Sequence, residues 1–214
     1  MIARLDKVLD PSPLAIAGAY SVVPEIHGDD RGLFFELYRP DLLERAIGWH
    51  VDVMQVNASV SGRGVLRGMH WTDGEAGQAK FVSVLSGSVI DVLLDVRLGS
   101  PTFGEAVVVE LDAGNRRAVA VPVGVAHGFL ALEPNSTVVY FTDHIYSPAA
   151  ERSITPFDPA VQSALGTSTR GLALSVNDRD RTAPTLDDAR RLALLPRWSG
   201  SATVDRRASA AQTD

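Results

Sequence analysis

The chain has 214 residues, of which 45% are hydrophobic, and a formal net charge of −6. This size fits a single packed domain, which we expect over residues 1–198, followed by a polar, aperiodic tail over residues 199–214. The absence of cysteine excludes disulfides, thiolate metal sites and a cysteine nucleophile. The acidic charge argues against a nucleic-acid partner, and no segment approaches the roughly 20 apolar residues of a membrane span, so we expect a cytoplasmic protein.

Short apolar or alternating runs predict consecutive β-strands from about Val22 to Tyr146. The clearest are residues 33–38, 80–85, 88–95, 105–111 and 137–141. The Gly-containing segments 85–88 and 112–115 resemble hairpin turns. Because no strand precedes a helix long enough for a parallel crossover, we predict an all-β, antiparallel sandwich or barrel.

Two short peripheral helices are expected around this β-structure. Residues 41–47 follow Pro40 and stop at Gly48, and residues 185–195 lie between Pro184 and Pro196. Proline just before a helix, acidic residues in its first turn and glycine or proline after its last turn are the usual boundary signals.

Two of the five histidines sit in turn-forming, glycine-rich sequences. His70 ends the run Gly64-Val65-Leu66-Arg67-Gly68-Met69-His70, and His127 ends a P-x-G-x-x-H segment that begins at Pro122. Such segments can deliver imidazoles into the mouth of a small barrel. A metal-binding cupin would carry a second histidine two positions after the first, but Thr72 stands there, so we expect no metal and keep a metal cupin oxygenase as an alternative.

The other chemistry these histidines suit is proton transfer, because a neutral imidazole is a suitable base near pH 7. A carboxylate that orients this base could come from Asp178 or Asp180. Lys80 could stabilise an enolate and Tyr140 could return a proton. Taken alone, Lys80 is better explained as a solvated charge at a strand edge, and Tyr140 as a core aromatic residue.

Several motifs together resemble the dTDP-4-dehydrorhamnose 3,5-epimerase family, over about Val22 to Leu195. The matching segments are 28–36, 55–59, 64–70, 78–80, 99–104 and 122–129, with the spacing of His70, Lys80, His127, Tyr140 and Glu151. The resemblance implies a cupin-like jelly roll without metal or cofactor. It also implies a homodimer in which an exchanged N-terminal strand completes each site.

The same resemblance implies roles for individual residues in epimerising a dTDP-4-keto-6-deoxyhexose at C3, C5 or both. His70 matches the base, Tyr140 the acid on the opposite face, and Lys80 the lysine that stabilises the enolate. Asp180 is favoured over Asp178 as the partner of the base. The residues that match substrate contacts are Arg31, Glu36, Gln55, Asn57, Arg67, His127 and Glu151.

Some positions depart from the rhamnose-pathway pattern. Thr72 replaces a usual glutamine and Phe141 a usual lysine. These departures resemble epimerases of antibiotic deoxysugar pathways, some of which invert one carbon only. A catalytically silent sugar-nucleotide-binding relative is a further alternative.

Overall fold

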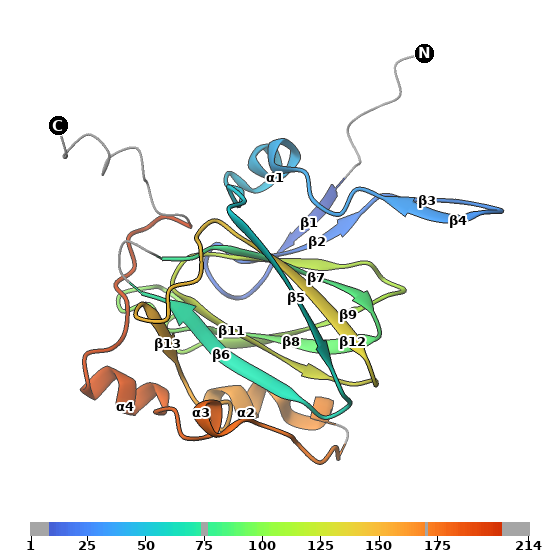
Figure 1. Ribbon diagram of the computed structural model, residues 1–214. Helices are drawn as coiled ribbons and strands as arrows, with labels where there is room; N and C mark the ends of the chain where they lie inside the picture. Colours follow the sequence, from blue (N-terminus) through green and yellow to red (C-terminus); the bar gives the residue numbers. More distant parts are fainter. Residues whose placement is uncertain (1–8, 74–76, 170, 203–214) are drawn as a thin grey trace.

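The structure is a computed structural model that describes residues 9–73, 77–169 and 171–202. Two antiparallel sheets face each other (Figure 1). The first has the order β1 (Leu9–Pro13), β2 (Tyr20–Pro24), β10 (Ala118–Val121), β7 (Lys80–Ser86), β12 (Ser136–Thr142) and β5 (Gln55–Ser61). The second has the order β13 (Glu151–Ser153), β6 (Leu66–Thr72), β11 (Val125–Ala131), β8 (Ser88–Asp95) and β9 (Ala106–Asp112). The all-β prediction is confirmed.

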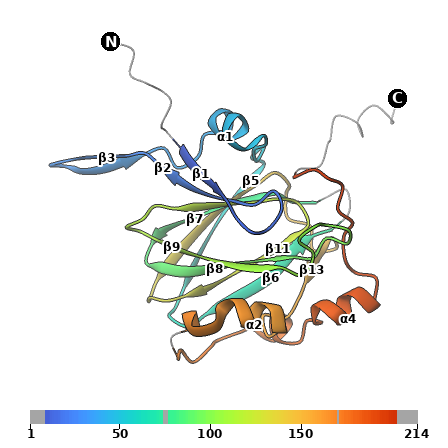
Figure 2. The same ribbon diagram turned by 180° about the vertical axis from the view of Figure 1, so that it is seen from behind.

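A separate hairpin of β3 (Ile26–Asp29) and β4 (Gly32–Phe35) projects away from the two sheets. It forms a long extension beyond β1 and β2 in both views (Figures 1 and 2). The predicted strand over residues 33–38 is therefore displaced, since β4 ends at Phe35 and the chain then turns into α1. Seven of the eight residues in the two strands of the hairpin are exposed, and the eighth, Phe35, is half-buried.

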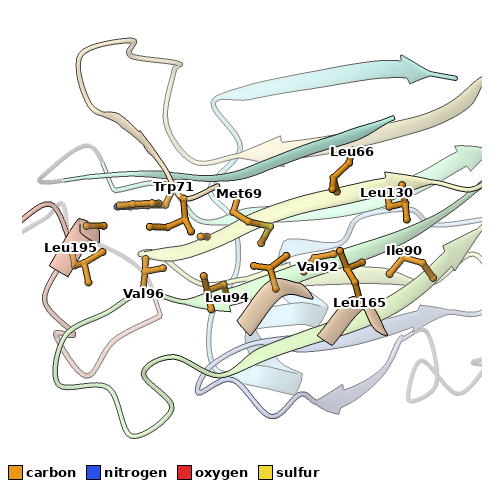
Figure 3. Close-up of a cluster of buried hydrophobic side chains, with 14 of the residues drawn as sticks. Leu66, Met69, Trp71, Ile90, Val92, Leu94, Val96, Leu130, Leu165 and Leu195 are labelled. Atoms are coloured by element: carbon orange, nitrogen blue, oxygen red, sulfur yellow. The ribbon is translucent and has the colours of Figure 1, made fainter. Parts of the chain in front are cut away.

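Strand β8 shows why the central strands appear as uninterrupted apolar runs in the sequence. All eight of its residues are buried. Val89 and Leu93 belong to a cluster between the two sheets, whereas Val92 and Leu94 belong to one on the opposite face. Figure 3 shows this second cluster, in which β6, β8 and β11 pack with Leu165 of α2. A strand covered on both faces has no polar side to create an alternating pattern.

Both predicted hairpins are wrong. The segment around Gly87 joins β7 in the six-stranded sheet to β8 in the five-stranded sheet, and residues 113–117 return the chain from β9 to β10 in the same way. A tight turn can join two neighbouring strands of one sheet, and it can equally join strands of two facing sheets. The choice between them depends on burial: β8 is covered on both faces and pairs with β9 and β11.

Within the part of the chain that the structure describes, five short helical segments surround the sheets: α1 (Pro40–Ile47), α2 (Pro159–Leu165), η3 (Gly166–Thr169), α3 (Asp178–Arg181) and α4 (Leu186–Arg191). The first agrees with the sequence prediction and ends at Gly48, which has a left-handed φ of 80°. The predicted helix over 185–195 is capped by Thr185 but stops at Arg191. Ala193 then takes a positive φ of 55°, and the chain turns so that Leu195 reaches the core at 7% exposure.

The C-terminal end of the described chain adds no strand to these sheets. Within the expected tail, the carbonyl of Ala202 accepts a hydrogen bond from the Val123 N–H at 2.8 Å, and residues 203–214 lie outside the described part. None of the described helices has the length and hydropathy needed to cross a membrane.

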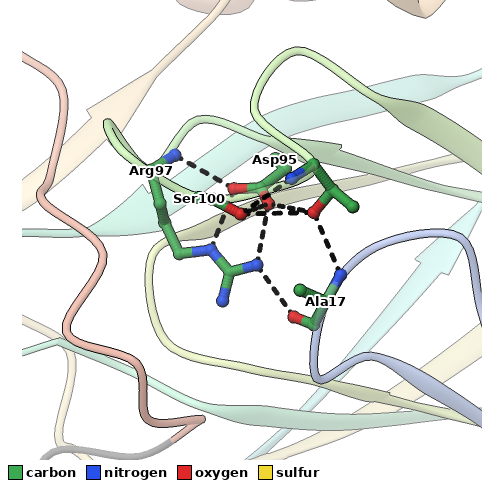
Figure 4. A network of polar contacts seen from close by, with 5 residues as sticks. Ala17, Asp95, Arg97 and Ser100 are labelled. Carbon is green, nitrogen blue, oxygen red and sulfur yellow. Dashed lines mark hydrogen bonds and ion pairs between the residues drawn. The ribbon is translucent and has the colours of Figure 1, made fainter.

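A buried ion pair ties the loop after β8 to the segment before β2 (Figure 4). Asp95 accepts hydrogen bonds from Arg97 Nε and Nη2 at 2.8 Å each, and from the hydroxyls of Ser100 and Thr102. Burial opposes ionisation of Asp95, but the hydrogen bonds from Arg97, Ser100 and Thr102 outweigh it and hold its pKa below the usual value. Arg97 also donates to the carbonyl of Ala17 at 2.8 Å.

We predict that Arg97→Met lowers the free energy of unfolding by about 3–5 kcal/mol, because it leaves the Asp95 carboxylate buried without its countercharge. Urea denaturation measures the change. Arg191→Met is the matched control, since Arg191 is 72% exposed and pairs with Asp188 at the surface, where an ion pair contributes little. Equal, small effects of the two variants would contradict the prediction.

Candidate active site

Strands β6 and β11 come unusually close at two glycines. A Cβ on Gly68, whose φ is 111°, would lie 2.6 Å from the Gly128 Cα, and one on Gly128 would lie 2.5 Å from the Arg67 carbonyl oxygen. Any other residue would force the strands apart. The pairing also shifts register between His127 and Phe129. This arrangement places His127 directly opposite His70.

His70 forms a hydrogen bond with a buried carboxylate from a distant part of the chain. Its Nε2 lies 2.7 Å from Asp180 Oδ1, and the other oxygen of Asp180 accepts from the Gly68 N–H at 3.1 Å. Burial opposes ionisation of Asp180, but the hydrogen bond and charge of His70 outweigh it, so the pKa of this carboxyl is lowered. An ionised Asp180 accepts a hydrogen bond from the Nε2–H of His70. In the neutral ring this leaves Nδ1 as the nitrogen that can accept a proton.

Asp180, rather than Asp178, therefore lies at His70. Asp178 occupies the first position of the same short helix α3 and is exposed. Asn177 caps this helix, because its side chain accepts from the Asp180 N–H at 2.7 Å. The cap turns Asp180 inward, where it is 1% exposed.

His127 has a carboxylate partner of its own. Its Nε2 lies 2.7 Å from Asp91 Oδ2, and Asp91 is completely buried in β8. Asp91 is not among the residues predicted from the sequence. A charged residue inside the apolar run 88–95 was the available signal, because carboxylates are rarely fully buried unless they are paired.

Lys80, the first residue of β7, lies beside His70 and is only 7% exposed. Its Nζ donates to the His70 carbonyl oxygen at 3.2 Å. Burial lowers the pKa of Lys80 to about 8, although Glu151 and Asp91 partly oppose the shift. The side chain is thus a cation near neutral pH that loses its charge in mild alkali.

Tyr140 approaches from the other sheet. It lies on β12, paired with Asn57 of β5 and Val82 of β7, whereas His70 belongs to the five-stranded sheet. Burial, and next the charge of Glu151, raise the pKa of Tyr140. Its hydroxyl therefore keeps its proton at neutral pH, and a base and a proton donor line the same cavity from opposite sheets.

A chain of hydrogen bonds follows the mouth of this cavity. Gln55 donates to the Asn57 side chain and accepts from the Tyr146 N–H, both at 2.8 Å. The Tyr146 hydroxyl donates to Glu151 Oε2 at 2.9 Å, and Arg179 Nη2 lies 2.8 Å from the same oxygen.

The cavity measures about 420 Å³. Nine of the eleven predicted site residues line it: Gln55, Asn57, Arg67, His70, Lys80, His127, Tyr140, Glu151 and Asp180. Tyr146, Gln78 and Arg179 also line it and were not predicted. Within the described residues, no group of three or more His, Asp or Glu side chains is arranged to hold a metal ion.

Arg31 and Glu36 are the two predicted residues that do not reach this cavity. Arg31 sits at the tip of the β3–β4 hairpin, where its side chain is 90% exposed and contacts Asp29. Glu36 pairs with Arg39 at 2.8 Å. Neither side chain lines the cavity of its own chain.

The model of the dTDP-4-dehydrorhamnose 3,5-epimerase family matches residues 13–188. The chain belongs to this family. A family member from Mycobacterium tuberculosis, a dTDP-4-dehydrorhamnose 3,5-epimerase, is 48% identical over 187 residues, which cover 86% of this chain and 91% of that protein. The family predicted from the motifs is confirmed, and so is the prediction that the protein is an isomerase.

Two solved structures of the family share the fold. NovW, a 4-keto-6-deoxy sugar epimerase from the novobiocin cluster of Streptomyces spheroides, has a TM-score of 0.84 at 38% identity, over 89% of this chain and 94% of its own. ChmJ, a 3'-monoepimerase from Streptomyces bikiniensis in complex with dTDP-quinovose, has a TM-score of 0.82 at 40% identity, over 94% and 98%. The cupin-like jelly roll expected from the resemblance is confirmed.

Proposed function

We propose that the protein epimerises a dTDP-4-keto-6-deoxyhexose at C3, C5 or both, with His70 as the base. The observation that carries the proposal is the pairing of His70 with Asp180 in a cavity that also presents Lys80 and Tyr140. The 4-keto group makes the neighbouring C–H bonds acidic, so the reaction needs a base, a cation near the ketone oxygen and an acid on the other face.

In this mechanism His70 Nδ1 removes the proton alpha to the ketone, and the electrons of the C–H bond move to the carbonyl oxygen. The Lys80 ammonium stabilises the enolate. Asp180 stabilises the imidazolium that forms on His70. The Tyr140 hydroxyl then delivers a proton to the carbon from the opposite face, which inverts the stereocentre.

The remaining lining residues fit the rest of such a substrate. Arg67, exposed on β6, and His127 are assigned to the sugar and diphosphate, because their donors suit phosphate oxygens. Gln55, Asn57 and Glu151 at the mouth are assigned to further substrate contacts. No metal or redox cofactor takes part in these steps.

The decisive experiment follows deuterium from heavy water into C3 and C5 of dTDP-4-keto-6-deoxyglucose by proton NMR. We expect exchange by the wild type, loss of exchange in His70→Ala, and nearly unchanged dTDP binding by that variant. Asp178→Asn, on the exposed side of α3, is the control and should exchange normally. Near wild-type exchange by His70→Ala would refute the mechanism, and no exchange by the wild type would favour a silent binding relative.

We predict that the exchange rate falls as the pH rises through about 8, the pKa of Lys80. The ammonium is present below that pH and lost above it, so enolate stabilisation disappears on the alkaline side. A kcat–pH profile measures the effect. Lys80→Arg keeps a cation in this range and should lack the alkaline fall, even if it is slower. The same fall in Lys80→Arg would assign the titration to another group.

The protein is also proposed to act as a homodimer in which the β3–β4 hairpin completes the site of a second copy. Support comes from β5, where Gln55, Asn57 and Ser59 line the cavity while Val56 and Val60 on the other face are 52% and 61% exposed. A strand with its polar face inward and its apolar face outward needs a partner to cover it.

The hairpin has the same character. Leu33 and Phe34 are 51% and 66% exposed, and Arg31 at its tip reaches no residue of the cavity in its own chain. A second copy would both cover these apolar side chains and receive Arg31 and Glu36 for nucleotide binding.

Subunit mixing tests this arrangement. Arg31→Ala and His70→Asn should each be weak or inactive alone, but a mixed dimer contains one site with both residues intact. We expect about a quarter of wild-type activity after statistical exchange of subunits. Size-exclusion chromatography with light scattering confirms the dimer. Absence of recovery from dimers that have exchanged subunits would contradict the exchanged hairpin.

A further inference from the structure

The short helix α3 carries Asp180 and is too short to be stable by itself. It has four residues, Asp178–Arg181, and an isolated helix of this length does not persist in water. Contacts on each side must therefore hold it. Asp180 supplies one by its bonds to His70 and the Gly68 N–H, and the Asn177 cap supplies a second.

The residue before Asp180 supplies another contact, to a different strand. Arg179 Nη2 lies 2.8 Å from Glu151 Oε2, and the Glu151 side chain is only 15% exposed. Burial would raise the pKa of Glu151, but hydrogen bonds from Tyr146 and Arg179 outweigh it and lower the pKa. Glu151 is thus an enclosed carboxylate that receives Arg179 while the guanidinium stays half-exposed.

These contacts close a ring through three elements. Glu151 lies on β13, which pairs with β6 so that Ser153 is opposite His70. From β6 the ring passes through His70 to Asp180, one residue along the helix to Arg179, and back to Glu151. A carboxylate held within such a ring has fewer orientations available than one on a free loop.

We propose that Glu151 and Arg179 are positioning residues that hold the Asp180 carboxylate against His70. The inference rests on the proposed function in one respect, that His70 is the catalytic base. It gives Glu151 a task beyond contact with the substrate and gives Arg179, which the sequence analysis left unassigned, a definite role. The ion pair acts on the reaction through the orientation of the imidazole.

The consequence for catalysis follows from the tautomer of His70. Only while Asp180 accepts from Nε2 is Nδ1 of the neutral ring free to take a proton. If α3 loosens, the ring can rotate or carry its proton on Nδ1, and that fraction of the enzyme cannot act as a base. The loss falls mainly on kcat, because the residues assigned to the sugar and diphosphate, Arg67 and His127, lie on other elements and stay in place.

The test compares Arg179→Gln with Arg181→Gln. Both remove an arginine from the same four-residue helix, but the Arg181 guanidinium lies over the Phe157 ring, 5.5 Å from its centroid, and does not line the cavity. For Arg179→Gln we expect kcat for deuterium wash-in to fall about 10- to 100-fold, as small misplacements of catalytic groups do. KM should change by less than about threefold, and Arg181→Gln should match the wild type.

Further measurements on these variants identify a positioning role. Nitrogen-15 NMR of the His70 ring should show the Nε2–H tautomer in the wild type and a mixture in Arg179→Gln. The double variant Glu151→Gln/Arg179→Gln should be no slower than the slower single variant, because both remove the same link. Arg179→Lys should recover part of kcat, and the thermal midpoint of each variant checks folding.

Three results would overturn the inference. An unchanged kcat with a raised KM would make Arg179 a substrate-binding cation, and equal losses in Arg179→Gln and Arg181→Gln would mean only that the helix had been weakened. Additive losses of kcat in the double variant would show that Glu151 and Arg179 act independently and not through their ion pair. These outcomes presuppose exchange by the wild type; its absence would instead refute the proposed function and this inference with it.

Discussion

The close approach of β6 and β11 is the constraint from which the rest of the site follows. Gly68 and Gly128 leave no room for a side chain between the strands, and His70 and His127 become direct neighbours across the pair. Each imidazole then takes a buried carboxylate, Asp180 from the C-terminal segment and Asp91 from β8. The glycines are therefore required for the site as well as for the packing of the strands, since a wider spacing would move His70 away from His127.

Electrostatic balance explains how so many charges can line one cavity. Asp180 and Asp91 are shielded behind histidines, Glu151 is held by Tyr146 and Arg179, and Lys80 stands near two of these carboxylates. Burial of a charge without such a partner would cost several kcal/mol. The pairing leaves the cations able to face an anionic ligand while the carboxylates act on protein groups.

Much of the architecture could be predicted from local patterns. The strands over 80–85 and 88–95 and the helix that ends at Gly48 appear close to their predicted bounds. The path between the sheets could not be predicted, because the turn at Gly87 is compatible with a hairpin and with a crossing between sheets. Which one forms depends on partners far away in the chain.

The site shows the same division. Family spacing brought together nine of the residues that line the cavity, including Lys80 and Tyr140, whose ordinary structural explanations local sequence could not exclude. Asp91 was missed because it lies within an apolar strand. Arg179 was missed because its partner Glu151 is 28 residues earlier, and only the fold shows that β13 and α3 are adjacent.

The separation of His70 and Asp180 by 110 positions has a consequence for how the protein is made. On the ribosome, β6 emerges long before the segment that carries Asp180, so the base remains without its carboxylate until the chain has grown by another 110 residues. Contacts of such long range also slow folding, because loop closure must precede them. Until then the strands already made expose apolar surface that the folded protein buries, a period in which chaperones have the most to protect.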